Sequence, residues 1–516
     1  MKHQLPAWTA ALSVTALLAV VVNGPGAGPG GLTEVSTVGR APVFADSPAT
    51  VTLRPGDSAD RVVGEPPAID VLTRRPGRAQ GELFVTVQNP EREFAHGPQI
   101  MDDLGRPIWF RELAAGHYAA DFRVQEYKGE KVLTWWEGEA SDTGVGKGVG
   151  YIANENYEII ATVQTPDPGE GMDLHEFRLT PQGTALIISY QRKPHSLAEV
   201  GGAAEGTVID NVVQEIDIVT GEKLMDWSAL EHVPLPQSDL RPPPGSAGPW
   251  DYLHVNAVDI ATDGNLLISG SGASTIYKVD RRTGRIIWRL GGRNSDFRLG
   301  VGARFNWQHD VRAVGPNTYR LFDNATRALS GYESRVEWIK VDPARGTAEL
   351  VRQQIHPDPV SGTMEGGSQE LSNGNTFVSW GRSSPGRISE FSRDGRLLFD
   401  ATLPEAGSSY RAYRLDWKGR PLTEPELLVE DAASGVVHAN WNGASDVVGW
   451  RLLAGQSQGD LKPVATAAWD GLDTPITVPA GARDAGRLQV QALDQRGRVI
   501  GSSSVTPVGA AASDVN

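Results

Sequence analysis

Short apolar runs alternate with turn residues in a pattern that repeats between about residues 81 and 400. One half of the repeat is a strand pair joined by a turn that resembles Asp-x-x-x-Gly, in which the glycine supplies the positive φ of a tight hairpin. Copies of this turn begin at Asp102, Asn154, Asp217, Asp280, Asp342 and Ser392. The other half is a second strand pair, as at residues 177–187, 258–269 and 370–380. Two hairpins per unit in about six units, with a period of roughly 50–63 residues, predict an all-β six-bladed β-propeller.

Loops rich in Gly, Pro and Ser interrupt the repeat and are predicted to lie between its units, around a mouth over the propeller axis. They span residues 193–206, 234–249 and 291–306, and one short helix is predicted at residues 229–232. Six tryptophans of the repeat are predicted to pack between blades rather than to bind ligand: Trp109, Trp135, Trp136, Trp227, Trp288 and Trp380.

The pattern changes after residue 421 to short, evenly spaced strands that predict a small β-sandwich of immunoglobulin or fibronectin type. Its strands are predicted at residues 436–441, 448–453, 465–468, 475–478 and 487–493. The predicted domains are therefore a signal peptide or membrane anchor (1–31), an extended lead-in (32–76), the propeller (77–421), the sandwich (422–508) and a disordered tail (509–516). Within the lead-in, one strand is predicted at residues 50–53.

The amino-terminal segment predicts export. A mostly apolar run at residues 7–22 follows Met1-Lys2-His3, and its length suits a signal-peptide core better than a spanning helix of about 20 residues. No small-residue cleavage site stands at the usual distance, so attachment to a membrane through this run is the alternative to cleavage. Either outcome predicts a secreted protein or one on the extracellular face of the cell membrane.

Charge and composition narrow the function. A net charge of −15 argues against a nucleic-acid partner, and any anionic substrate requires a local cationic site. The chain has no cysteine, which excludes disulfides, thiolate metal sites and cysteine nucleophiles. With 59 glycines and 34 prolines, the sequence predicts many turns and few long helices.

Three of the ten histidines share one placement, directly before a strand-like run: His175, His254 and His309. One histidine placed this way is more often structural, but three copies on the inner strands of a propeller would converge at its channel. Converging imidazoles can bind a metal or share nucleophilic and proton-transfer roles near neutral pH. Nearby carboxylates lack the spacing diagnostic of a metal site, so neither a metal nor another cofactor is predicted.

Residues 66–421 carry motifs that resemble the bacterial and fungal arylsulfotransferases that use no nucleotide sulfate donor. The motifs are Asp173-Leu174-His175-Glu176-Phe177, Trp250-Asp251-Tyr252-Leu253-His254-Val255-Asn256, Ile276-Tyr277-Lys278-Val279-Asp280, Trp288-Arg289-Leu290-Gly291-Gly292, Phe305-Asn306-Trp307-Gln308-His309-Asp310 and Leu321-Phe322-Asp323-Asn324. The resemblance implies a six-bladed propeller. It also implies transfer of a sulfuryl group from a phenolic sulfate ester to a phenol through a sulfated histidine.

The resemblance also implies roles for individual residues. His309 would be the nucleophile, His254 and His175 would line the sulfate pocket, and Asn256 and Trp307 would contact substrate. The family's pattern has an arginine after the hairpin at residues 264–266, but here the segment 269–274 reads Ser-Gly-Ser-Gly-Ala-Ser. Arg312 and Arg327 are the candidates to replace it in binding the sulfate.

This departure leaves three functions open. The first is the sulfotransferase, which the motifs favour. The second is hydrolysis of aryl-sulfate or phosphate esters, with water as the acceptor. The third is an extracellular binding or adhesion module whose histidine site has degenerated, because a lost cation at the reacting group typically costs a few kcal/mol of barrier.

Overall fold

The computed structural model describes residues 54–55, 57, 66–88, 95–114, 116–141, 144–245, 248–325, 333–404, 407–429 and 435–508. The chain divides into a unit of residues Met1–Val43, none of which is described, and a unit of residues Phe44–Asn516. The predicted signal or anchor segment, the predicted strand at residues 50–53 and the predicted tail lie outside the described residues. Within the described ranges, no helix has both the length and the apolar character needed to cross a membrane.

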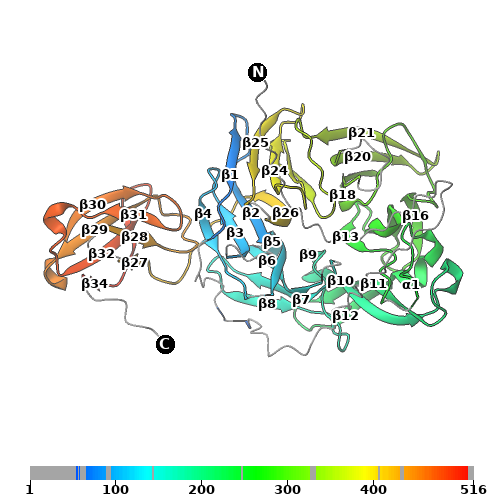
Figure 1. The fold of residues 1–516 in the computed structure, drawn as a ribbon, viewed down its shortest axis with the longest axis horizontal. Coiled ribbons are helices and arrows are strands. Elements are labelled where there is room, and N and C mark those ends of the chain that lie inside the picture. Colours follow the sequence, from blue (N-terminus) through cyan, green and yellow to red (C-terminus); the bar gives the residue numbers. More distant parts are fainter. Residues whose placement is uncertain are drawn as a thin grey trace, which may run out of the picture. The chain divides into compact units, whose positions relative to one another are not determined.

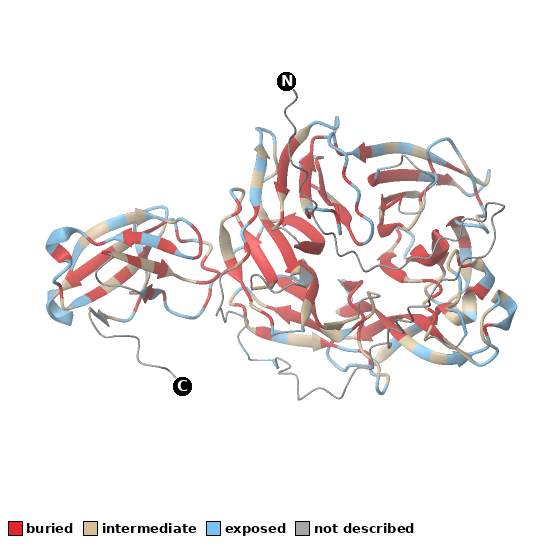
Figure 2. Ribbon diagram, in the orientation of Figure 1, coloured by how far each residue is buried: buried red, intermediate tan, exposed pale blue. Residues whose placement is uncertain are grey.

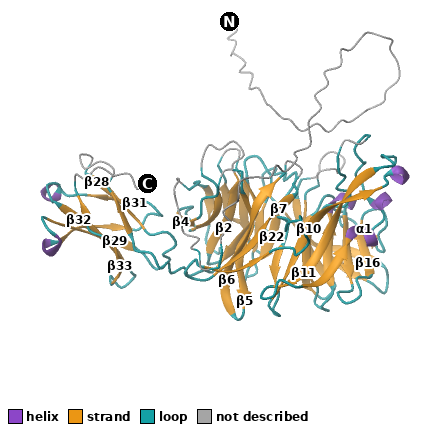
Figure 3. Ribbon diagram, turned by 90° about the horizontal axis from the view of Figure 1, so that it is seen from below, coloured by secondary structure: helices purple, strands orange, loops and turns teal. Residues whose placement is uncertain are grey.

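The predicted all-β class is confirmed, since strands and turns make up nearly all of the described chain (Figure 3). The α-helix found in it is α1 (Ala229–His232), at the predicted position, where the Ser228 side chain accepts a hydrogen bond from the Glu231 amide. The remaining helical turns are of the 3-10 type: η1 (Ala198–Val200), η2 (Leu235–Gln237), η3 (Ser271–Ala273), η4 (Gln458–Asp460) and η5 (Ala480–Ala482).

The described part of residues 70–415 forms six sheets of four or five strands. In order along each sheet, the first three are β26 (Ser408–Leu415), β2 (Glu82–Gln88), β3 (Gly97–Met101) and β4 (Pro107–Phe110); β5 (Tyr118–Tyr127), β6 (Glu130–Ala140), β7 (Gly146–Ala153) and β8 (Ile159–Val163); and β9 (Phe177–Leu179), β10 (Thr184–His195), β11 (Gly206–Asp217) and β12 (Lys223–Ser228). The other three are β13 (Val255–Ile260), β14 (Leu266–Gly270), β15 (Thr275–Val279) and β16 (Ile286–Gly291); β18 (His309–Gly315), β19 (Thr318–Asp323), β20 (Arg335–Asp342), β21 (Thr347–Ile355) and β17 (Arg298–Leu299); and β22 (Gly367–Glu370), β23 (Thr376–Ser379), β24 (Arg387–Phe391), β25 (Leu397–Thr402) and β1 (Asp70–Arg74).

The six sheets surround a common centre, and the first strand of each sheet lies nearest to it (Figure 1). These inner strands contact one another: β22 contacts both β18 and β26, β26 and β9 contact β5, and β13 contacts β18. Two pairings bring distant parts of the chain together. β26 pairs with β2, from Glu82↔Leu415 to Gln88↔Ser408, and β1, which falls in the predicted lead-in, pairs with β25. The last strand of the ring therefore completes the first sheet as its innermost strand and joins the two ends of the ring.

Apolar residues form separate core clusters within this ring, and buried residues fill the inner strands (Figure 2). The six tryptophans predicted to be core residues all belong to these clusters: Trp109, Trp135, Trp136, Trp227, Trp288 and Trp380. That prediction is confirmed.

One loop prediction is wrong. Residues 193–206 were expected to lie between repeats, but β10 and β11 are hairpin partners in one sheet and stay paired as far as His195↔Gly206. The Lys193 ammonium reaches the Asp210 carboxylate across the strands at 2.7 Å, and Leu197 is buried beneath the tip of the hairpin. Cross-strand charge pairing and this apolar anchor extend the strands through a stretch whose composition favours a loop.

The described residues after 421 form two further sheets. One contains β27 (Glu426–Leu428), β28 (Val436–Asn440) and β31 (Thr474–Thr477), and the other contains β30 (Lys462–Ala468), β29 (Gly449–Gly455), β32 (Arg487–Leu493), β33 (Val499–Ser502) and β34 (Thr506–Pro507). Apolar residues of both sheets share one core, with Val437 and Ile476 from the first sheet and Trp450 and Val490 from the second. All five strands predicted here are present.

Candidate active site

Three sheets bring their histidines to the centre of the ring. His175 lies two residues before β9, His254 lies directly before β13, and His309 is the first residue of β18. Each of these strands is the inner strand of its own sheet. The side chains of His175 and His309 are almost completely buried, and that of His254 is 15% exposed.

Two of the three imidazoles are in direct contact, and the third is close enough for their charges to affect its pKa. The ring centroids of His175 and His254 lie 4.8 Å apart at an angle of 85°. Tyr190 stacks on His175 at 5.6 Å, and Tyr410 meets the same ring edge-on at 5.5 Å. Positive charge on either of these histidines lowers the pKa of His309, so all three rings share one electrostatic environment. The histidines that share a placement in the sequence therefore share a location in the fold.

Two of the histidines are held by carboxylates that precede them in the chain. Nδ1 of His175 bonds to Asp173 Oδ1, and Nδ1 of His254 lies 2.5 Å from Asp251 Oδ2. Asp173 also accepts a hydrogen bond from the Gly146 amide at 2.7 Å, which fixes its orientation. A carboxylate that accepts at Nδ1 places the proton there and directs Nε2 away from the carboxylate, as in other carboxylate–histidine pairs.

The two carboxylate–histidine pairs differ in the direction in which the pKa of the histidine is shifted. Burial lowers the pKa of His254, but the charge of Asp251 and its hydrogen bond outweigh burial, so the net pKa is raised. Burial dominates at His175, where Asp173 does not compensate and the His254 charge opposes protonation further, so the pKa is lowered. A proton at the pair therefore resides on His254 rather than on His175.

His309 has a neutral partner instead. Its Nδ1 lies 2.7 Å from Asn324 Oδ1 and 3.1 Å from the Trp307 carbonyl oxygen. The Asn324 amide nitrogen donates to the carbonyl oxygens of Gly362 (2.7 Å) and Glu365 (2.9 Å), so its oxygen must face the imidazole. Because both partners of Nδ1 are acceptors, Nδ1 carries the proton and Nε2 carries the lone pair.

Burial is the largest cause that lowers the pKa of His309, the hydrogen bond to Asn324 raises it, and the nearby charges of His254 and His175 lower it, so that the net pKa is about 3. His309 is therefore neutral at neutral pH. A neutral imidazole with an unprotonated nitrogen can act as a nucleophile.

The backbone near the rings adopts left-handed conformations that non-glycine residues rarely adopt. His254, Trp307 and Asp310 have φ values of 50°, 58° and 54°. Each such residue costs on the order of 1–2 kcal/mol and persists where surrounding contacts hold it. Asn256 provides one of these contacts, since its amide nitrogen donates to the Gln308 carbonyl oxygen at 2.9 Å.

A buried network of charges lies against the histidine strands. It consists of three guanidiniums and three carboxylates: Arg123, Arg312, Arg411, Asp121, Glu176 and Asp310. Glu176 directly follows His175, and Asp310 directly follows His309. Burial disfavours the charge of Glu176, but the three guanidiniums outweigh it and hold its pKa well below the usual range. Glu176 therefore stays ionised in a network that contains three basic and three acidic side chains.

The structure describes only one of the two arginines that were predicted to bind the sulfate. The Arg312 guanidinium donates to Asp310 at 2.9 Å and to the Val258 carbonyl oxygen at 3.1 Å, and it lies 2.9 Å from Glu176. Its predicted contact with substrate stays a prediction. Arg327 lies outside the described residues. The segment that lacks the family arginine is buried behind the site, where Ser271 Oγ donates to the His254 carbonyl oxygen at 3.2 Å.

Several residues of the site were not predicted from the sequence. Asp173 and Asp251 stand two and three residues before their histidines, and this spacing was a readable signal. Asn324 is the last residue of the motif at residues 321–324, but no pattern indicates its contact with His309, and Tyr190 and Arg411 come from segments without a motif. Among the described residues, no group of three His, Cys, Asp or Glu side chains is placed to hold a metal ion.

Comparisons with known proteins add the family. Residues 123–403 match the family described as arylsulfotransferase (ASST). A search of curated proteins finds no match. Similar solved structures include a protein of unknown function from Bacteroides caccae, with a TM-score of 0.38 and 11% identity over 65% of this chain and 98% of that chain. A protein from Lactobacillus plantarum has a TM-score of 0.35 and 15% identity over 78% of this chain and 97% of that chain.

A further similar structure is catalytically inactive virginiamycin B lyase from Staphylococcus aureus with quinupristin. It has a TM-score of 0.33 and 8% identity over 64% of this chain and 87% of that chain. The family match is of a different kind, because it spans more than half of the sequence and includes the strands that carry all three histidines. The chain belongs to the arylsulfotransferase (ASST) family.

Proposed function

We propose that this protein transfers a sulfuryl group from a phenolic sulfate ester to a phenol, through a sulfohistidine formed on His309. Membership of the arylsulfotransferase family supports the class of reaction and of substrate. One observation carries the choice of nucleophile. Nδ1 of His309 faces two acceptor oxygens, which leaves the lone pair on Nε2, and a pKa of about 3 keeps that nitrogen unprotonated at neutral pH.

In the first half-reaction, Nε2 of His309 attacks the sulfur of the donor. The N–S bond forms, the bond from sulfur to the aryl oxygen breaks, and its electron pair leaves with the phenolate. His254 is the proton donor for that oxygen, because Asp251 raises its pKa and so favours its protonated form. Asn324 accepts from the Nδ1 proton and so stabilises the positive charge that develops on the ring.

The second half-reaction runs in reverse on a new phenol. His254, now neutral, takes the phenol proton, the phenol oxygen attacks sulfur, and the N–S bond breaks to restore His309. His175 stays neutral beside it, because a charge on His254 at 4.8 Å disfavours a second proton. One proton thus moves between His254 and the two phenols, and no net proton is consumed.

The imidazolium of His254 also replaces the family arginine as the positive charge that faces the sulfate. Charge stabilisation and positioning carry most of the catalysis in phosphoryl transfer, and the same reasoning applies to sulfuryl transfer. Asn256, Trp307, Arg312 and Arg327 are proposed as further substrate contacts, on the basis of their positions in the motifs.

The proposal is tested with 4-nitrophenyl sulfate as donor and phenol as acceptor. Wild-type protein should release 4-nitrophenol faster when phenol is added, and mixing without acceptor should give one equivalent of 4-nitrophenol and a protein heavier by one SO₃ group. His309→Ala should lose both signals, whereas His438→Ala, in the C-terminal sheets, should keep them. Equal turnover by His309→Ala and wild type would exclude the mechanism.

The same experiment separates the alternative functions. Turnover that is indifferent to phenol would indicate an ester hydrolase, with water as the acceptor. An intact protein that releases no 4-nitrophenol under either condition would indicate a binding or adhesion module with a degenerate site.

The architecture and location complete the proposal. We propose that the six sheets are blades of a six-bladed β-propeller, supported by the β26–β2 pairing that joins the ends of the ring. The two later sheets are proposed to be an immunoglobulin- or fibronectin-like sandwich, supported by their common core. Export to the outside of the cell, with cleavage or retention of the apolar run at residues 7–22, is supported by the sequence of that run.

A further inference from the structure

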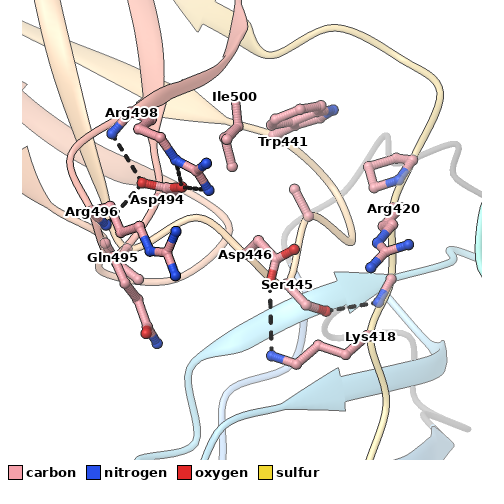
Figure 4. Close-up of a pocket in the computed structure, with 14 residues that line it drawn as sticks. Lys418, Arg420, Trp441, Ser445, Asp446, Asp494, Gln495, Arg496, Arg498 and Ile500 are labelled. Carbon is pink, nitrogen blue, oxygen red and sulfur yellow. Dashed lines mark hydrogen bonds and ion pairs between the residues drawn. The ribbon is translucent and has the colours of Figure 1, made fainter.

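A cavity lies away from the histidines, where the segment after β26 meets the C-terminal sheets. Its volume is about 500 Å³, within the range of about 300–1,000 Å³ typical of small-molecule sites. None of the residues that line it belongs to the histidine site or to the charge network beside it. Figure 4 shows Arg496 and Arg498 on one side of this cavity and Lys418 and Arg420 on the other.

The lining is cationic in a protein whose net charge is −15. Four of the lining side chains are basic and two are acidic, so the cavity has a local excess of positive charge. Arg498 is paired with Asp494 at 2.6 Å, and Lys418 lies 3.8 Å from Asp446. The other two basic residues of the lining are arginines, and they carry the excess of positive charge.

Those arginines are Arg420 and Arg496. Arg420 lies 3.5 Å from Glu155, and both side chains are more than half exposed, so the pair is weak. The Arg496 guanidinium has no ion pair with any of the described residues, and its backbone amide is held by Asp494 at 2.8 Å. A guanidinium presents planar, paired donors that match the oxygens of a sulfate, sulfonate or carboxylate group.

The wall of the cavity between these cations is apolar. It includes the indole of Trp441 and the side chains of Val448 and Ile500, both of which are substantially exposed. The Trp441 ring packs on the Gly501 backbone and its Nε1 donates to the Thr423 carbonyl oxygen at 2.8 Å, so the indole is held in place. A fixed aromatic face beside guanidinium groups suits a ligand that has both a ring and an anionic substituent.

The floor of the cavity is also rigid. The Gly419 amide donates to Ser445 Oγ at 3.0 Å, and the Ser445 amide donates back to the Gly419 carbonyl oxygen at 3.2 Å. A Cβ at Gly419 would lie 1.9 Å from the Tyr157 hydroxyl, so the backbone must approach that ring closely. A site formed on a fixed backbone loses little conformational entropy when it binds.

We propose that this cavity binds an aromatic anion, in which an aryl ring lies on Trp441 and one or two anionic groups meet Arg420 and Arg496. The ligand class includes aryl sulfates, sulfonates and carboxylates, whether free or at the end of a polymer. The inference does not depend on the proposed sulfuryl transfer, because the site contains no residue of that reaction.

Isothermal titration calorimetry on the full chain tests the proposal, with naphthalene-1,5-disulfonate as the probe. A sulfonate has a C–S bond and cannot act as a sulfuryl donor, so binding is measured without turnover. Saturable binding with a Kd below about 1 mM is expected, weakening as salt is added. Ethane-1,2-disulfonate carries the same anionic groups without a ring and should bind at least tenfold more weakly.

Paired variants locate the binding. Arg420→Gln/Arg496→Gln should weaken binding of the aromatic probe at least tenfold and leave turnover of 4-nitrophenyl sulfate unchanged. Arg282→Gln/Arg285→Gln removes the same charge from an exposed turn and should bind as wild type does. Binding should also survive in His309→Ala.

Three results would overturn the proposal. The first is the absence of saturable binding by wild type. The second is equal affinity for the aromatic and aliphatic disulfonates, which would remove the role of Trp441. The third is binding that survives the double cavity variant but disappears in His309→Ala, which would place the probe at the histidine site instead.

Discussion

Arg411 joins the segments that carry the three histidines, and its replacement by methionine tests the buried network directly. The guanidinium donates to Asp121 at 2.9 Å and to the Asn256 carbonyl oxygen at 3.1 Å. It also lies 3.4 Å from Glu176 and 3.5 Å from Asp310. Methionine has a similar length and no charge, so Arg411→Met removes these contacts with little loss of volume.

The expected loss of stability follows from the charge balance. The network has three positive and three negative charges, and Arg411 is 1% exposed at its side chain. The substitution leaves one buried carboxylate charge uncompensated, although Asp121, Glu176 and Asp310 each keep another arginine. Breaking a buried pair from one side typically costs about 3–5 kcal/mol, so we expect a decrease of about 3 kcal/mol in the free energy of unfolding.

Urea unfolding followed by tryptophan fluorescence measures this loss, and a second substitution tests its cause. Arg411→Met/Asp121→Asn restores neutrality, and the new amide faces the Tyr413 hydroxyl that now donates to Asp121 at 2.8 Å. Asparagine also tolerates the φ of 54° at this position. The double variant should regain about 1–2 kcal/mol over Arg411→Met.

The control is Arg498→Met, which removes an exposed arginine from its pair with Asp494 and should unfold at nearly the wild-type urea midpoint. The reasoning is refuted if the double variant is no more stable than Arg411→Met alone. It is equally refuted if Arg411→Met unfolds at the same urea concentration as Arg498→Met.

Three further predictions concern single protons. Asn324→Leu removes a hydrogen-bond acceptor at Nδ1 of His309. The first-turnover rate with 4-nitrophenyl sulfate should therefore fall about tenfold, which corresponds to about 1.4 kcal/mol in the activation free energy. A variant that reacts at the wild-type rate would contradict the role of the amide. Asp251→Asn removes the charge that raises the pKa of His254, so the alkaline limb of the kcat/KM profile, where the acid loses its proton, should move to lower pH. Burial and the charge of Asp323 raise the pKa of Glu337 to about 9, although the charge of Arg335 acts in the opposite direction. Between about pH 5 and pH 9 the folded protein holds a proton on Glu337 that the unfolded chain has lost, so the free energy of unfolding decreases as the pH rises through this range. Glu337→Gln should remove this dependence and gain up to about 1.4 kcal/mol per pH unit relative to wild type in urea titrations, and parallel profiles would contradict it.

The parts of the fold that could be predicted from sequence are those with local causes. Hairpin turns such as those at Gly221 and Gly284 have φ values of 73° and 72°, and glycine at such positions marks the turn in the sequence itself. The pairing of β26 with β2 and that of β1 with β25 have no local signal, since more than 300 residues separate the paired strands. The length of the β10–β11 hairpin depends on the cross-strand Lys193–Asp210 pair, which composition does not reveal.

The residues of the site can likewise be divided into those that the sequence marks and those that only the structure reveals. The histidines could be found because each precedes a strand, and their convergence follows once these strands are the inner ones of neighbouring sheets. Asn324 lies 15 residues after His309, on the far side of the β18–β19 hairpin, and Arg411 lies 235 residues after Glu176. Asn324 is marked in the sequence as the last residue of a motif, but its contact with His309 and the contacts of Arg411 become visible only in three dimensions.

The nature of each histidine's partner divides the roles in the proposed reaction. The substrate group is anionic, the chain carries −15, and the family arginine is absent, so the site needs a cation of its own. The buried arginines do not supply it, because carboxylates of equal number neutralise them. In the proposed reaction Asp251 supplies it indirectly, since its charge raises the pKa of His254 and favours the imidazolium. Asn324 has no charge to offer, so His309 stays neutral and nucleophilic in the same environment. The charge of Asp251 therefore suits His254 to the role of the acid and the amide of Asn324 suits His309 to that of the nucleophile, whereas burial lowers the pKa of His175 despite its carboxylate partner Asp173.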